Sequence, residues 1–258
     1  MSMSAVGSLE YAQARLCARY GQRPDELAWR HIEHVRSFAG MLDVARTSAL
    51  RVWMAGIGPT TTPHEIEALL RGQWRALVAD VARWMPDAWQ AAVAWCAVAA
   101  DLPVVVHLAR GGATLPWMQD DPVLRDLCER AAAGFGTAPI GGPLAPLAPA
   151  WADPGRIGSL WRDEWRRRMP GRHADAPRLV DEFAHLMHRH LGAFRDPSVR
   201  DGWPLRRTLQ ARLVLLFRRA MLDPAAAFVF LALAALDLER LRSELLRRAA
   251  FPALTLAS

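Results

Sequence analysis

The residues whose spacing most suggests chemistry are histidines and carboxylates between positions 181 and 188. Asp181, His185 and His188 recur at i, i+4 and i+7, so they share one face of a helix. Glu182 and His185 also form a Glu-x-x-His pair, the unit from which di-iron helical bundles build their metal centres. These residue types at this spacing predict a metal site at Glu182, His185 and His188.

A plainer interpretation of the same residues is a solvated helix face. A di-iron centre needs a second Glu-x-x-His, and the chain has none. The face of Asp181 lies opposite the apolar stripe of Phe183 and Met187, where polar side chains are expected to meet water. His31 and His34 are three residues apart, but nothing in the sequence brings them to this site. A metal-dependent helical protein or enzyme therefore stays an alternative.

Nucleophilic and cofactor chemistry have little support in the sequence. Cys17, Cys96 and Cys128 are too scattered for a metal knuckle or a disulfide framework, and they suit a reducing cytoplasm. Cys96 lies in an apolar run, which is typical of a small buried residue. The chain contains no lysine, so it has neither a phosphate-binding loop of the Walker type nor a Schiff-base lysine. We expect no enzymatic activity and no cofactor.

Tryptophan and arginine alternate in one short segment. Trp161 and Trp165 are four residues apart, among Arg162, Arg166 and Arg167. Tryptophan and arginine are the residues enriched at binding hot spots, so these five residues are predicted to bind a partner. A domain-packing helix with a solvated basic face explains the pattern equally well. No recognised nucleic-acid-binding module accompanies it, and a nucleic-acid partner is not expected.

The charge is concentrated in the second half of the chain. The net charge is +6, whereas residues 155–258 carry 19 arginines against 11 acidic residues, a net charge of +8. Such a basic region attracts an acidic protein, a lipid surface or a nucleic acid. The most apolar stretch, Ala225 to Leu236, is 12 residues long, well short of the roughly 20 that a membrane span needs. No signal peptide is recognised, and a cytoplasmic protein is expected.

Helical start and stop signals recur along the chain, and strand signals are missing, which predicts an all-α fold. The strongest start is Thr62 to Glu65, where Thr62 and Glu65 form a capping box around Pro63 at the first helical position. The helix that follows ends at Pro86. Further helices are predicted at about 8–20, 24–38, 87–96, 103–111, 122–133, 175–192, 204–221 and 224–249.

A Gly/Pro-rich stretch between the helices predicts two helical lobes. The lobes cover residues 1–112 and 158–258, and residues 113–157 form a linker with one short helix. The landmarks Pro86, Asp101 and Arg110 of the first lobe recur in the second at offsets of 138, 136 and 137 residues. This regular spacing suggests that one helical unit is duplicated.

Four segments, spread over about half of the chain, resemble the family of central-stalk socket subunits (the C/d family) of V-type and archaeal-type rotary ATPases. They look like the family's opening Tyr-x-x-Ala-Arg helix, its Ile-Glu-x-x-Leu helix, a segment closing on Arg-Gly, and the closing acid-x-x-Asn-Leu-Arg helix. In this chain they are Tyr11 to Arg15, Ile66 to Leu70, Asp101 to Gly111, and Pro224 to Leu245. The family's asparagine is replaced by Val104 and Arg240.

The resemblance implies a non-catalytic function. Members of this family form an all-helical, funnel-shaped socket that couples the rotating central shaft to the rotor ring in the membrane. The basic second lobe would then face an acidic protein partner, such as a stalk or rotor subunit. Any membrane association would be peripheral, at the inner face, and would depend on those partners. A standalone bacterial adaptor or regulator is the remaining alternative.

Overall fold

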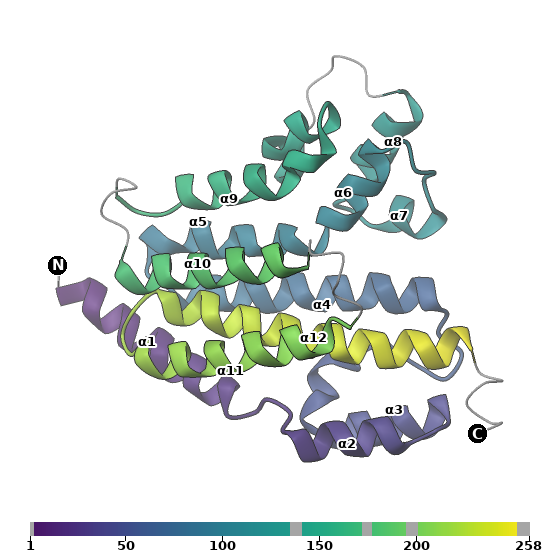
Figure 1. Cartoon of the computed structure of the whole chain (residues 1–258), viewed down its shortest axis with the longest axis horizontal. Helices are drawn as coiled ribbons and strands as arrows, with labels where there is room; N and C mark the ends of the chain where they lie inside the picture. The colour runs from purple at the N-terminus through teal and green to yellow at the C-terminus, as the bar shows by residue number, and fades with distance from the viewer. Residues whose placement is uncertain (1–2, 135–140, 172–176, 195–200, 252–258) are drawn as a thin grey trace.

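Two long helices, α4 and α12, pack against each other through the centre of the molecule (Figure 1). This computed structural model describes residues 3–134, 141–171, 177–194 and 201–251. Helix α4 (Pro63–Trp84) begins at the predicted capping box, where the Thr62 hydroxyl accepts from the Glu65 amide and the Glu65 carboxylate accepts from the Thr62 amide. Helix α12 (Ala225–Ala250) is buried all round over residues 225–231, because every one of them is apolar.

Shorter helices surround this pair. One group comprises α1 (Met3–Tyr20), α2 (Glu26–His34), α3 (Phe38–Thr47), the 3-10 helix η1 (Ala49–Trp53) and α11 (Trp203–Arg219). A second group covers the opposite side and comprises α5 (Asp87–Ala94), η2 (Trp95–Ala100), α9 (Ile157–Arg167) and α10 (Arg178–Ala193). The remaining elements are α6 (Leu102–Ala109), α7 (Pro116–Asp120), α8 (Arg125–Ala132), η3 (Gly142–Trp151) and η4 (Pro154–Arg156). Every regular element in the described ranges is helical, which confirms the predicted all-α class.

The predicted helix at 24–38 is shorter in the structure, and a second helix that was not predicted, α3, follows it. Helix α2 ends at His34, and the Ser37 hydroxyl accepts a hydrogen bond from the Gly40 amide as the N-cap of α3. The guanidinium of Arg248, which is 1% exposed, donates to the carbonyl oxygens of Ile32 and Val35 at 2.9 and 2.7 Å. These bonds satisfy carbonyls that the end of α2 leaves without helical partners, so the break is stabilised by a residue more than 200 positions away.

Buried ion pairs join the helices at the centre. The Asp237 carboxylate on α12 accepts two hydrogen bonds from Arg23, at 2.7 and 3.0 Å. Arg75 on α4 donates to Asp101 at 2.6 Å and to both carboxylate oxygens of Asp121 at 2.9 Å. Burial raises the pKa of the Asp101 and Asp237 carboxyls, and their arginine partners oppose that rise. Because each buried carboxylate has an arginine partner, these pairs position the helices without leaving an isolated charge.

Residues from both predicted lobes contribute to one continuous core, which extends from Ala12 to Leu245. The predicted linker region contains helical turns with a buried face, since Leu144 and Leu147 of η3 lie in this core and η3 contacts both α6 and α9. The landmark residues Asp101 and Asp237 are alike in being buried and paired with arginine, but a duplicated unit is not confirmed.

Membrane-spanning potential is limited to one bent pair of segments. Within the described residues no single helix is long and apolar enough to span a membrane. The segments Asp87–Ala100 and Leu102–Ala109 have the required length and hydropathy only when they are taken together, and they are bent by 54° relative to each other.

Candidate binding site between α9 and α10

The two tryptophans of α9 turn toward the protein interior. Their rings stack on each other, with centroids 6.1 Å apart and planes 12° apart. Trp165 is only 3% exposed and packs edge-on against Phe228 of α12, at a centroid distance of 5.1 Å. Trp161 is partly exposed, and its backbone carbonyl accepts from the Trp95 indole at 2.9 Å. Trp165 is therefore a packing residue, and binding of a partner by α9 would use Trp161 and the arginines.

The arginines of α9 differ in their partners. Arg167 and the following Arg168 both donate to the Glu164 carboxylate, at 2.6 and 2.7 Å. The hydrogen bond from Arg167, followed by that from Arg168, lowers the pKa of Glu164 below its ordinary value. Arg162 and Arg166 have no carboxylate partner in the part of the chain that the structure describes. The predicted binding segment therefore has two arginines whose positive charge is not neutralised locally.

The predicted metal residues on α10 are already engaged by other groups. Both Glu182 carboxylate oxygens accept from Arg219 of α11, at 2.7 and 2.9 Å. The His185 ring nitrogen Nδ1 lies 2.9 Å from the carbonyl oxygen of Asp181, one turn earlier on the same helix. Among the described residues, no three His, Cys, Asp or Glu side chains are placed to hold a metal ion. The metal site at Glu182, His185 and His188 stays a prediction, and its one carboxylate, Glu182, is paired with Arg219.

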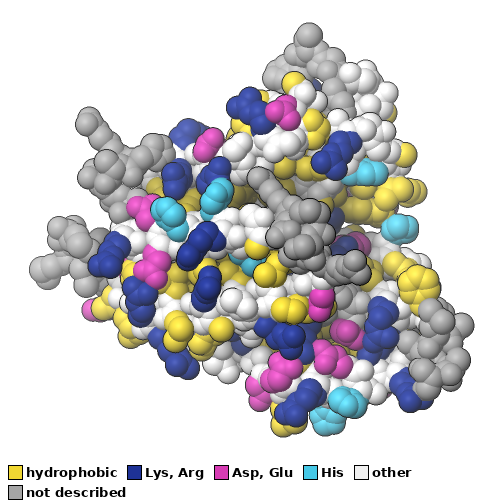
Figure 2. Space-filling view, viewed as in Figure 1, with side chains coloured by type: hydrophobic (Ala, Val, Ile, Leu, Met, Phe, Trp, Pro, Cys, Tyr) yellow, Lys and Arg dark blue, Asp and Glu magenta, His cyan; other side chains and the backbone are white. Residues whose placement is uncertain are grey.

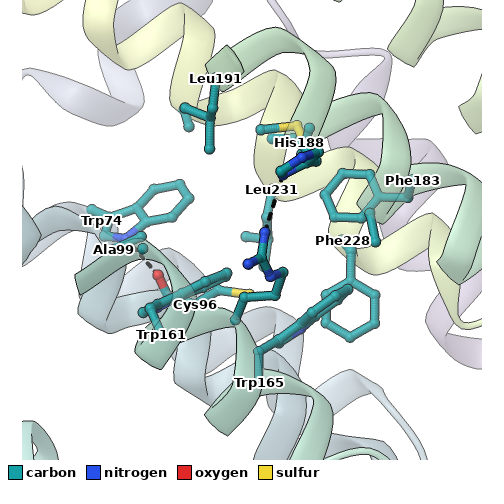
Figure 3. Close-up of a pocket in the computed structure, with 16 residues that line it drawn as sticks. Trp74, Cys96, Ala99, Trp161, Trp165, Phe183, His188, Leu191, Phe228 and Leu231 are labelled. Atoms are coloured by element: carbon teal, nitrogen blue, oxygen red, sulfur yellow. Dashed lines mark hydrogen bonds between the residues drawn. The ribbon is translucent and has the colours of Figure 1, made fainter. Parts of the chain in front are cut away.

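The tertiary structure brings the two predicted sites together. Arg162 Nη1 on α9 lies 3.1 Å from His188 Nδ1 on α10, which is the dashed line at His188 in Figure 3. A guanidinium has only donors, so His188 Nδ1 accepts and the imidazole proton is assigned to Nε2. Arg162 therefore donates in this contact and His188 accepts.

Behind this contact lies a cavity of about 200 Å³. Its walls come from five elements: Trp161 and Trp165 from α9, Phe183 and Leu191 from α10, Phe228 and Leu231 from α12, Trp74 from α4, and Cys96 and Ala99 from η2 (Figure 3). The lining is largely apolar and aromatic, and Arg162 and His188 are among its few polar members. Lining of this kind is typical of sites for small molecules.

Polar groups in the cavity wall show what chemistry is available there. The Trp74 indole donates to the Cys96 carbonyl oxygen at 3.2 Å. Burial raises the pKa of the Cys96 thiol to about 12, so it stays protonated at neutral pH and is not a nucleophile. The indole nitrogens of Trp161 and Trp165 are buried, and neither has an acceptor among the described residues. The cavity is therefore equipped for binding rather than for covalent catalysis.

A second cleft, of about 420 Å³, adjoins this cavity and shares Trp74 with it. Its acidic side chains are matched by arginines, since Arg242 donates to Glu67 and Arg206 donates to Glu239. The remaining cation, Arg71, lies 3.5 Å from the Asp101 carboxylate. Charge in this cleft is balanced, in contrast to the mouth of the α9–α10 cavity.

The cavity was not predictable from the sequence, although two residues at its mouth, Arg162 and His188, are among the predicted site residues. The space exists because small residues, Gly158, Ala184 and Ala232, come from three helices to the same place. In the sequence, each of them is a single small residue that indicates no cavity. The cavity could have been predicted only if the packing of α9 against α10 and α12 had been known.

No protein-family model matches this chain, and no curated protein or solved structure is significantly similar to it.

Proposed function

We infer that this protein is a non-catalytic subunit that binds an acidic protein partner through the basic face formed by α9, α10 and α11. The observation that supports this inference is a set of arginines on these helices with no carboxylate partner in the described ranges. Besides Arg162, they are Arg166, Arg178, Arg189, Arg212 and Arg218.

These arginines lie on a surface where positive charge exceeds negative charge. Residues 155–258 have 19 arginines and 11 acidic residues. Figure 2 shows basic side chains over α9, α10 and α11 with fewer acidic ones between them. Such a surface steers an oppositely charged protein toward itself and favours one orientation of binding.

The basic face is also held rigidly. Arg219 joins α11 to Glu182 of α10, and Arg206 joins α11 to Glu239 of α12. A preorganised array of charges loses little conformational entropy when a partner binds. This rigidity suits a subunit that transmits force between partners.

The resemblance to the rotary ATPase socket subunits extends the proposal. The partner would then be a subunit of the central shaft or the rotor ring, and the mechanism would be mechanical coupling through packed helices. The protein would work in the cytoplasm, and contact with the membrane would be peripheral and made through the partner.

Quantitative co-purification from the native organism tests this proposal. The pair Arg166→Glu and Arg189→Glu reverses two charges on the basic face, and Arg51→Glu with Arg110→Glu makes the same charge change on η1 and after α6. We expect the first pair to lose an acidic partner that the wild type and the control pair retain, with retention falling as salt rises.

Identification of the partner by mass spectrometry separates the two parts of the proposal. Rotary shaft or ring subunits would support the socket function, whereas another acidic protein would leave only the association. Equal recovery by both double variants would show that the basic face is not the binding surface.

A further inference from the structure

The mouth of the α9–α10 cavity combines a cation with an apolar interior. Arg162 is half-buried, and its one hydrogen bond among the described residues goes to the His188 ring, 3.1 Å away. By contrast, Arg168 is paired with Glu164 and Arg219 is paired with Glu182. The guanidinium fork of Arg162 is therefore free to bind an anion that arrives from outside the chain.

The interior limits what can accompany that anion. A cavity of about 150 Å³ holds a benzene molecule, so the 200 Å³ here accommodates one ring with a short substituent, or a chain of about six to eight carbons. The walls offer the faces and edges of Trp161, Phe183 and Phe228 together with the Leu231 side chain. An apolar group gains free energy by leaving water for such a lining.

We propose that this cavity binds a small carboxylic acid with an apolar chain or ring. The carboxylate lies on the guanidinium of Arg162, and the apolar part lies against Trp161, Phe228 and Leu231. His188 holds the Arg162 guanidinium at the mouth by accepting one of its N–H groups, which leaves the others for the carboxylate. This small-molecule site goes beyond the protein association proposed above and shares only Arg162 with the basic face.

Calorimetric titration of the full-length protein with octanoate tests the site. Burial of the alkyl chain predicts a Kd of about 10 µM to 1 mM. Octanol, which keeps the chain and loses the charge, is expected to bind at least about tenfold more weakly. Acetate, which keeps the charge and loses the chain, is expected not to bind. Quenching of tryptophan fluorescence by 8-bromooctanoate places the chain beside the indoles.

Substitutions assign the binding to this cavity. Arg162→Gln is expected to weaken octanoate about tenfold or more and to leave octanol unchanged, because only the carboxylate uses the charge. Arg166→Gln, one turn along the same helix and outside the cavity lining, is the matched control and is expected to bind octanoate within about twofold of wild type.

Two filling variants test the apolar part. Ala184→Leu adds bulk from α10, and Gly158→Leu adds it from α9, where a new Cβ would meet no atom within 4 Å. Both variants are expected to lose octanoate and octanol binding while keeping the wild-type circular dichroism spectrum. Because they lie on different helices, misfolding of one leaves the other as a test.

Three results would overturn the proposal: no saturable binding of octanoate, wild-type affinity in Arg162→Gln, or wild-type affinity in a folded filling variant. The outcome is distinguishable from that of the co-purification experiment, since Arg166 and Arg189 do not line the cavity. Loss of a protein partner in Arg162→Gln without any octanoate binding would assign Arg162 to the partner surface instead.

Discussion

Arginine side chains lie against the apolar interior in two regions of this protein, and they have different partners in the two regions. At the centre, Arg23 and Arg75 donate to Asp237 and Asp101, whose side chains are 5% and 1% exposed. At the α9–α10 cavity, Arg162 lies against apolar walls, and its hydrogen-bond partner among the described residues is His188 rather than a carboxylate. An arginine that has a carboxylate partner within the chain joins elements of the fold. An arginine without such a partner among the described residues keeps its positive charge available to a ligand.

The two regions also differ in packing. Beside Arg23 and Asp237 the free space is only about 50 Å³, whereas the α9–α10 cavity, which Phe228, Leu231 and Ala232 of α12 line, has about 200 Å³. A close-packed interior tolerates little change in volume, whereas a cavity accepts added atoms. The comparison therefore predicts opposite responses to similar substitutions in the two regions.

The largest effect is expected at the centre. Arg23→Ala leaves the buried Asp237 carboxylate without its hydrogen-bond partner, and we expect a loss of about 3 to 5 kcal/mol in the free energy of unfolding, measured by urea denaturation at neutral pH. The loss should shrink on acidification, because a protonated Asp237 no longer needs a cation. A loss below about 1 kcal/mol at neutral pH would mean that the pair does not join the helices.

The start of α4 is expected to show a smaller effect. Thr62→Ala removes the hydroxyl that accepts from the Glu65 amide, and the cost is about 1 kcal/mol by the same measurement. Thr62→Ser keeps the acceptor and should stay close to wild type. Equal losses in both variants would show that the capping hydrogen bond is not the cause.

The Glu164 carboxylate on α9 is expected to contribute at most about 1 kcal/mol to the free energy of unfolding, and this contribution depends on pH. The folded-state pKa of Glu164 is lowered below 4.5 by Arg167 and Arg168. Its contribution is therefore complete above pH 4.5 and is lost as the pH falls through the lowered value.

Melting temperature against pH, for the wild type and Glu164→Gln, measures that contribution. The two curves should differ at neutral pH and converge in acid. Curves that stay parallel down to about pH 3 would contradict the assignment.

The smallest effect is expected at the mouth of the cavity. Arg162→Ala breaks no ion pair within the described residues, so its stability should lie within about 0.5 kcal/mol of wild type. Compared directly with Arg23→Ala, this variant tests the difference between the two regions. A loss near that of Arg23→Ala would show that Arg162 has a structural role, and would weaken its assignment to an external anion.

The sequence by itself determined the all-α class and the capping box of α4. Local patterns suffice for these features, because apolar periodicity and N-cap chemistry act within a few residues of one another. The break between α2 and α3 was not predictable in this way, since Arg248 stabilises it from the end of α12. The identity of the Asp237 partner was equally hidden, because Arg23 lies more than 200 residues away.

At the site, the sequence predicts separate roles for two residues: partner binding for Arg162 and metal binding for His188. Only the tertiary structure decided that they touch, that Glu182 is taken by Arg219, and that Trp165 belongs to the interior. The physical reason is that helix periodicity shows which residues share a face, whereas the faces that meet are chosen by packing over the whole chain. The cavity between α9, α10 and α12 is a product of that choice.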